Sequence, residues 1–386
     1  MRGEELLVLF GDIDARYIED AARGSSVGAH LRRLGAAATT AAVVIGALHA
    51  AGVFGGTVAP AVRVHPETGL PLLSVAEPNA PGGFEADLAY DISEYVNGAP
   101  WTTETALSTL PVYRNVKYSD RTEEEQQTMM ETYLLELAGR LGLEEGTYTV
   151  APQERTSSLM LYADGIEIWL DSMMTARITF EPALVLSEGY NVPTHGANCG
   201  TYEEILSAAG YLRETYAELL DMDQPIPNIM GGFYDFNGEQ HYDISFYEGG
   251  GDVSQQIVAC EFQSVTFFTG YDGSLPLIVL HNEDLSQKAG DYPVISWEEA
   301  MELLLAGNFI TTVYDDIPAP TEDRVETVDI VYRFSAGNEY YMPYYCFRVE
   351  LPEMEVGDLH RYGRYYVPAV EEEYLVEMPV WDGSLF

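Results

Sequence analysis

An uncharged run at residues 34–62 constrains this chain more than any other feature, because the full 386 residues carry a formal net charge of −43. The run is rich in Ala, Gly and Thr, and it is longer than the about 20 residues that a membrane-spanning helix needs. We therefore predict one transmembrane helix over 34–60. Its small residues favour close packing against another helix.

Basic residues are unevenly placed around this predicted span. Arg23, Arg32 and Arg33 lie before it, and Arg63 lies after it. Because basic residues near a span stay on the cytoplasmic side, we expect a single-pass protein of the cell membrane with a cytoplasmic N-terminus and an extracellular C-terminal part. Two alternatives remain open: a signal peptide cleaved after the Ala-Pro-Ala at 59–61, and an Ala-rich helix buried in a soluble protein.

The first 33 residues form a leader with its own helical pattern. Its apolar side chains are too few to form a core, so they must dock elsewhere, and we predict that they bind a cytoplasmic partner. The alternative is docking on the membrane surface or on the protein's own span, although the acidic flank makes anionic lipid a poor target. The predicted partner-binding residues are Leu6, Leu7, Phe10, Ile13, Tyr17 and Ile18.

Negative charge is concentrated after the span. The leader holds five Arg and six acidic residues, which leaves a net charge of −42 for the rest of the chain. Such acidity disfavours binding to nucleic acid through a basic patch. Cationic ligands, divalent metals and basic partners remain compatible with it. An acidic external domain also suits a cation-rich, anionic cell wall, which indicates a Gram-positive source.

The sequence after residue 100 alternates helix starts with strand-rich stretches. A hydroxyl at the helix N-cap and a carboxylate three residues later satisfy backbone N–H groups that would otherwise lack partners. Asp-Gly at 164–165 and Asn-Gly at 237–238 predict hairpin turns. The three capping pairs are Thr122 with Glu125, Thr201 with Glu204, and Ser296 with Glu299.

These elements predict an α+β fold made of tandem units, each a helix packed on an antiparallel meander sheet, preceded by one transmembrane helix. Strands are expected within 147–180, 231–268 and 309–351. The predicted domains are a cytoplasmic leader at 1–33, the span at 34–60, an irregular stalk at 61–110, and three units at 111–195, 196–290 and 291–386.

The three cysteines are far apart and odd in number, so they indicate neither a disulfide framework nor a metal site. Cys260 and Cys346 fall within predicted strands and are interpreted as buried thiols. A single bridge, from Cys199 to Cys260 or from Cys260 to Cys346, is the alternative in an oxidising exterior.

Candidate metal ligands are few. His195 and Cys199 are four residues apart, but no second pair at matching spacing accompanies them. The stretch at 235–239 resembles the start of a calcium loop, yet Gln240 and Phe246 occupy the positions that require Gly and Glu. We therefore predict no metal and no cofactor.

Catalytic motifs are also missing from the sequence: no nucleophile elbow, phosphate-binding loop or dinucleotide fingerprint occurs. Carboxylate pairs such as Asp315-Asp316 are expected by chance among 62 acidic residues. We predict that the protein is not an enzyme. The alternative, an envelope hydrolase that uses carboxylates, requires a concave site containing an acid with a strongly raised pKa.

The segments "DYPVISWEEAMELLLAGNFITTV", "VDIVYRF" and "YYMPYYCFRVELP" share an order of elements: a Ser-capped helix, a Gly stop, and strands that end in an aromatic stretch. Across residues 291–352 this order resembles PepSY-like domains and the external domains of Yyc-type membrane regulators. The leader and span, residues 1–50, resemble uncharacterised Firmicute single-pass membrane proteins with an anti-sigma-like head.

The resemblance implies a regulator that acts across one membrane span. We expect an envelope sensor that signals through its leader to a cytoplasmic sigma factor or sensor kinase. The alternative is a membrane-tethered binding or scaffold module without a cytoplasmic partner. The extracellular ligand is not indicated by the sequence.

Overall fold

The computed structural model describes residues 63–75, 85–115, 121–153, 157–313, 317–333 and 338–381. The chain divides into two compact units, Met1–Leu72 with Asn79–Phe84, and Leu73–Pro78 with Glu85–Phe386. The predicted leader and span lie outside the described residues. Within the part that is described, no helix is both long and apolar enough to cross a membrane. In the first unit, residues 63–72 form a turn closed by a β-bridge between Val64 and Pro71.

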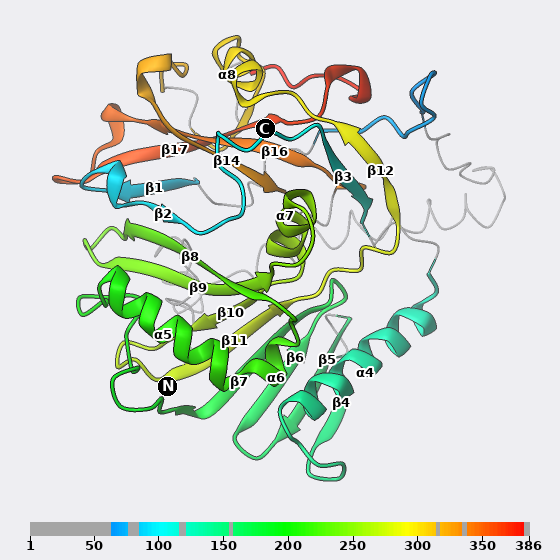
Figure 1. Ribbon diagram of the computed structural model, residues 1–386, viewed down its shortest axis with the longest axis vertical. Coiled ribbons are helices and arrows are strands. Elements are labelled where there is room, and N and C mark those ends of the chain that lie inside the picture. The colour runs from blue at the N-terminus through cyan, green and yellow to red at the C-terminus, as the bar shows by residue number, and fades with distance from the viewer. Residues whose placement is uncertain are drawn as a thin grey trace, which may run out of the picture. The chain divides into compact units, whose positions relative to one another are not determined.

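A nine-stranded sheet, antiparallel throughout, forms the larger part of the second unit (Figure 1). Two meanders that follow one another in the chain form this single sheet, because β7 (Thr175–Leu184) of the first pairs with β11 (Leu275–His281) of the second. The predicted units 111–195 and 196–290 therefore share this sheet. In spatial order the strands are β2 (Val96–Asn97), β8 (Pro225–Tyr234), β9 (Gln240–Glu248), β10 (Val265–Phe268), β11 (Leu275–His281), β7 (Thr175–Leu184), β6 (Ile166–Leu170), β5 (Ser158–Ala163) and β4 (Thr149–Gln153).

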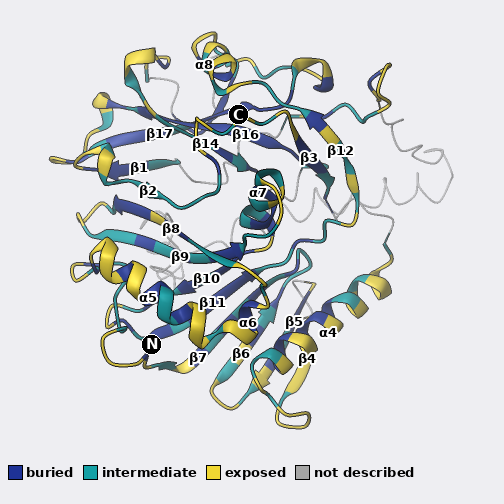
Figure 2. Ribbon diagram, viewed as in Figure 1, coloured by how far each residue is buried: buried dark blue, intermediate teal, exposed yellow. Residues whose placement is uncertain are grey.

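Three helices pack on one face of this sheet: α4 (Glu123–Arg140), α5 (Tyr202–Thr215) and α6 (Ala217–Leu220). In α4 the buried side chains recur at the spacing of one helix face, with Met130, Leu134 and Leu137 among them. Their contacts with the strands make a continuous apolar core, and the opposite faces of the helices are exposed (Figure 2). The predicted capping boxes that begin α4 and α5 are confirmed.

A second sheet contains β1 (Ala86–Ala89), β17 (His360–Pro368), β16 (Pro343–Glu350) and β14 (Val325–Tyr332) in that order, with β13 (Ile310–Thr311) also paired to β17. Seven of the eight residues of β16 are buried, as expected for a central strand covered on both faces. The helix α8 (Trp297–Leu305) contacts β17, and its predicted Ser296 capping box is confirmed.

A third, smaller sheet has the order β12 (Lys288–Pro293), β3 (Thr109–Arg114) and β15 (Tyr340–Tyr341). The stretch 85–110, predicted as part of an irregular stalk, therefore contains β1, β2 and the start of β3, each paired to strands far along the chain. Short 3-10 helices complete the regular structure: η1 (Ile92–Glu94), η3 (Glu322–Arg324), η4 (Pro352–Met354) and η5 (Glu372–Tyr374).

One expected strand is a helix. Residues within 257–268 were predicted as strand, but α7 (Val253–Phe262) occupies their first half, and only β10 follows as strand. The cause is a capping box that the sequence analysis missed, in which Asp252 accepts from the backbone of Gln255. Phe262 is fully buried and its ring contacts Tyr332 at 4.9 Å between centroids, so α7 lies between the nine-stranded sheet and the second sheet.

The α+β class with mainly antiparallel sheets is confirmed. The two predicted hairpin turns are present, and Gly165 and Gly238 both have positive φ there. All three cysteines are free, so neither alternative disulfide forms. Cys346 is buried in β16 as predicted, whereas Cys260 lies on α7 and not on a strand.

Candidate functional site

A cluster of charges, of which Asp87 and Arg348 are buried, joins the second sheet to the nine-stranded sheet. Asp87 of β1 accepts hydrogen bonds from Arg348 Nε at 2.8 Å and from Arg364 Nε at 2.9 Å. Arg348 also forms an ion pair with Asp329 of β14. The side chains of Asp87 and Arg348 are each only 6% exposed. We call Asp87, Asp329, Arg348 and Arg364 the charge junction.

Strand register brings these four side chains together. Arg348 of β16 and Arg364 of β17 are cross-strand partners. Like charges placed directly opposite one another destabilise a sheet unless counter-charges lie between them. Asp87 supplies one such charge and Asp329 the other, because β1 and β14 flank the two central strands. The junction therefore contains two carboxylates and two guanidinium groups, and its formal charges cancel.

Aromatic residues cover the junction from the side of the nine-stranded sheet. The guanidinium carbon of Arg348 lies 4.1 Å from the ring centroid of Tyr95 and 5.4 Å from that of Phe233 on β8. Tyr95 and Phe233 stack on each other at 4.8 Å. The Tyr95 hydroxyl donates to Asp329 at 3.0 Å, and Asn97 Nδ2 donates to the other oxygen of Asp329 at 2.9 Å. Residues of both sheets thus contact the same guanidinium group and the same carboxylate.

A glycine permits this close approach. Gly232, at a bulge in β8, has φ of +87°, and a Cβ added there would lie 2.0 Å from the carbonyl oxygen of Glu94. Any side chain at this position would push η1 and Tyr95 away from β8. The backbone contact therefore fixes where Tyr95 meets Phe233.

The pKa values of Asp87 and Arg348 are shifted towards their charged forms. Burial alone would raise the pKa of Asp87, but Arg364 and Arg348 together hold that pKa below its ordinary value. Burial opposes the charge of Arg348 as well, yet Tyr95, Asp87 and Asp329 raise its pKa above the usual range. Removing one partner of a buried pair leaves the other charge uncompensated, which typically costs about 3–5 kcal/mol.

Two further carboxylates, those of Glu283 and Glu261, have raised pKa values. Glu283 is 6% exposed and its Oε2 has no hydrogen-bond partner; burial and the neighbouring carboxylates of Asp171 and Asp284 raise its pKa to about 8. Glu261 of α7 accepts the backbone N–H of Tyr332 at 3.1 Å, and burial raises its pKa to about 7. Groups of this kind can act as acids or bases only where a substrate reaches them.

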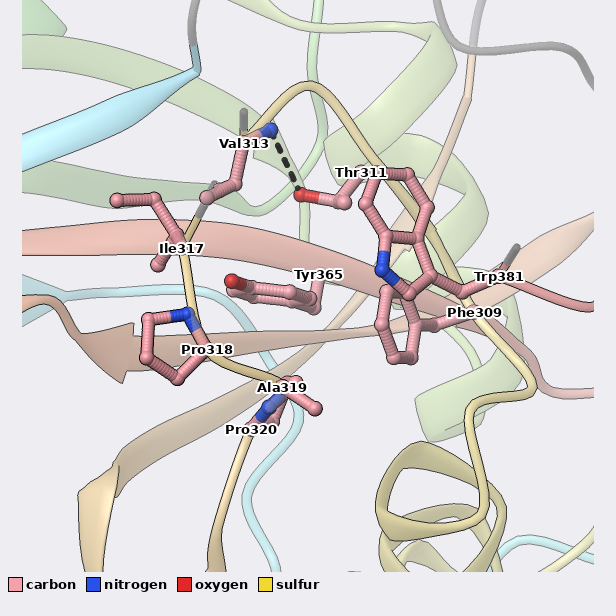
Figure 3. Close-up of a pocket in the computed structure, with 9 residues that line it drawn as sticks. All are labelled: Phe309, Thr311, Val313, Ile317, Pro318, Ala319, Pro320, Tyr365 and Trp381. Atoms are coloured by element: carbon pink, nitrogen blue, oxygen red, sulfur yellow. Dashed lines mark hydrogen bonds between the residues drawn. The ribbon is translucent and has the colours of Figure 1, made fainter. Parts of the chain in front are cut away.

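A groove lies elsewhere, against β13 and β17 (Figure 3). Trp381 stacks beside Phe309 at 5.8 Å, and the Val313 N–H donates to Thr311 Oγ1 at 3.1 Å. Among the lining residues that the structure describes, there is no acid, histidine or cysteine. Neither Glu283 nor Glu261 is among its described lining residues. The lining residues are Phe309, Thr311, Val313, Ile317, Pro318, Ala319, Pro320, Tyr365 and Trp381.

The predicted partner-binding residues Leu6, Leu7, Phe10, Ile13, Tyr17 and Ile18 lie outside the described residues. His195 forms a β-bridge with His241 and its ring contacts Tyr271 at 4.4 Å. Burial and His241 lower the pKa of His195, and burial raises the pKa of Cys199 to about 11. Asp235 accepts backbone N–H groups of its own hairpin turn, as the hairpin interpretation expects.

The charge junction was not predicted from the sequence. One signal was present: an arginine in the otherwise apolar stretch "YYCFRVEL" must find a buried counter-charge. The identity of the counter-charges could not follow from this signal, because Asp87 lies 261 positions away from Arg348 in the sequence.

Among the described residues, one group of metal-ligating side chains is close enough to hold an ion: Glu350, Glu355 and His360. No protein-family model matches the chain, and no curated protein matches it either.

Proposed function

We propose that this protein is a non-enzymatic regulator of the cell envelope, anchored by one membrane span, with its acidic α+β part outside the cell. In this proposal the external part repeats a helix-plus-meander plan in tandem, and its state is passed through the leader to a cytoplasmic sigma factor or sensor kinase. The alternative is a membrane-tethered binding or scaffold module that lacks a cytoplasmic partner.

The charge junction is the observation that carries the proposal. Arg348 contacts Asp87 and Asp329 of its own sheet and the rings of Tyr95 and Phe233, of which Phe233 belongs to the nine-stranded sheet. A displacement of β16 must therefore disturb the ion pairs or carry β8 with it. In this proposal the interface has a second arrangement, into which β16 and β8 move together when the external part changes state.

The surroundings of the junction support binding and transmission over catalysis. Each charge of the junction is paired with another protein group, so none is free to attack a substrate or to accept a proton from one. The likeness of residues 291–352 to external regulatory domains, and the uncharged run at 34–62 behind an apolar leader, supply the membrane and partner parts of the proposal.

Cross-linking in intact cells of the native host tests the proposal. Full-length tagged protein is compared with a Tyr17→Ala/Ile18→Ala variant and with Arg16→Ala, a neighbouring control that leaves the apolar leader residues in place. Membrane amounts are matched by immunoblot. We expect a sigma factor or sensor kinase to cross-link to the wild type and the control, and to be lost from the double variant. The same set of proteins on all three would overturn the regulator proposal and favour the scaffold alternative.

Protease treatment of the same cells tests the orientation. A protease added outside should degrade the region after residue 63 and leave a tag at the N-terminus intact. Full protection of the C-terminal region would contradict the external placement.

A further inference from the structure

The connection between β16 and β17 gathers three metal-ligating side chains at one end of the second sheet. Glu350 is the last residue of β16, Glu355 follows η4, and His360 is the first residue of β17. His360 Nδ1 lies 3.0 Å from Glu350 Oε1 and 3.4 Å from Glu355 Oε1. One ligand atom from each residue lies within 4.8 Å of the other two.

Backbone hydrogen bonds hold this connection in place. Val356 and Leu359 bond to each other in both directions at 3.0 Å, which closes a tight turn around Gly357. The N–H of Leu351 donates to the carbonyl of Arg361 at 2.7 Å, next to the first and last ligands. The three side chains are therefore presented from a fixed backbone, which is what a metal site needs to bind without a large ordering cost.

The carboxylate oxygens of Glu350 and Glu355 both lie close to the Nδ1 atom of the His360 imidazole. His360 Nδ1 is buried and has no hydrogen-bond partner, although both carboxylate oxygens are close to it. Ligands about 2.0–2.1 Å from a zinc ion, at tetrahedral angles, are about 3.4 Å apart, and at right angles about 3.0 Å apart. The separations of 3.0 Å and 3.4 Å from His360 Nδ1 are compatible with these values.

Among the described residues, His360 is the one ion-pair partner of Glu350 and of Glu355. Within the described residues, neither Glu350 nor Glu355 pairs with an arginine or a lysine. By contrast, Glu353 in the same connection bonds Arg324 through both carboxylate oxygens, at 3.1 and 3.3 Å. A divalent cation would neutralise the unpaired charges, and the side chains of all three ligands are 27–44% exposed, so an ion and a water molecule can reach them.

We propose that Glu350, Glu355 and His360 bind one divalent metal ion of the zinc type, with water completing the coordination. Two carboxylate oxygens and one imidazole nitrogen form a donor set that suits zinc and similar transition metals better than magnesium or calcium, which prefer oxygen alone. The bound ion would tie the end of β16 to the start of β17. The site does not depend on the leader or on the regulatory proposal.

Metal titration of the full-length protein tests this site. The protein is purified in detergent through a tag without histidine, stripped with a chelator, and titrated with Zn²⁺ by calorimetry at pH 7. We expect one saturable Zn²⁺ site in the wild type. Its Kd should rise at least tenfold in Glu350→Gln and in His360→Ala. Asp358→Asn, a carboxylate change in the same turn, should bind as the wild type. Absence of saturable binding, or equal binding by wild type and both ligand variants, would overturn the proposal.

Two further readouts keep the test valid if a variant folds poorly. Co²⁺ bound to the wild type should show visible d–d absorption that His360→Ala lacks, while both proteins keep the same far-ultraviolet circular dichroism. Zn²⁺ at 100 times the wild-type Kd should lower the unfolding equilibrium constant of the wild type about 100-fold, and should lower that of His360→Ala about 11-fold or less. Stronger binding of Ca²⁺ than of Zn²⁺, unaffected by His360→Ala, would contradict the assignment.

Discussion

Replacing Glu283 with glutamine should make the protein more stable, and increasingly so as the pH rises. The carboxyl group of Glu283 is buried near the carboxylates of Asp171 and Asp284, and its pKa is raised from 4.5 to about 8. Arg121 already forms an ion pair with Asp284. It is therefore not available as a counter-charge for Glu283 alone. An amide at position 283 fits the same space without a charge.

The sign and size of the effect follow from proton linkage. The folded state holds the Glu283 proton more tightly than the unfolded state, so this group's contribution is intact below about pH 4.5 and is lost as the pH rises through about 8. The loss is about 1.4 kcal/mol per pH unit between these values. Between pH 5 and pH 9 the free energy of unfolding of the wild type should therefore fall by about 4 kcal/mol relative to that of Glu283→Gln.

Urea unfolding at several pH values measures this difference. The free energy of unfolding of Glu283→Gln, minus that of the wild type, should grow by about 4 kcal/mol from pH 5 to pH 9. Glu302→Gln, an exposed carboxylate-to-amide change on α8, serves as the matched control. A constant difference for Glu283→Gln across the range would refute the reasoning.

Two other substitutions test the contact between the sheets. Asp87→Asn leaves Arg348 and Arg364 without their shared partner and should lower the free energy of unfolding by about 3–5 kcal/mol, measured in urea at pH 7; a loss below 1 kcal/mol would mean that the pairs add little. Gly232→Ala adds a methyl group 2.0 Å from the Glu94 carbonyl, and should destabilise by about 2 kcal/mol or more while reducing the stacking of Tyr95 on Phe233. An unchanged melting temperature for Gly232→Ala would contradict the close approach.

Local signals in the sequence predicted local structure well. The capping pairs at Thr122, Thr201 and Ser296 begin helices because each pair satisfies backbone groups within four residues, independently of the rest of the chain. The Asp-Gly and Asn-Gly turns form for the same reason. The error at 257–268 is also local, since the Asp252 cap uses Gln255 in place of the expected carboxylate.

Features that depend on distant pairing could not be predicted in this way. The charge junction requires β1, β14, β16 and β17 to be neighbours, which periodicity within a single strand does not reveal. The group of Glu350, Glu355 and His360 depends instead on a local turn, because the Val356–Leu359 turn must close before its ligands converge. Neither set has a characteristic spacing in the sequence. The merging of two predicted units into one sheet depends on the pairing of β7 with β11, which is also non-local.

Hydrogen exchange on the full-length protein is the most direct test of the central claim that the charge junction couples the two sheets. Asp87→Asn is compared with the wild type and with Glu302→Gln, with exchange followed at the amides of each strand. The account predicts faster exchange in β8 of the nine-stranded sheet as well as in β16 and β17, and no change in the control. Faster exchange confined to β1, β16 and β17 would contradict the coupling.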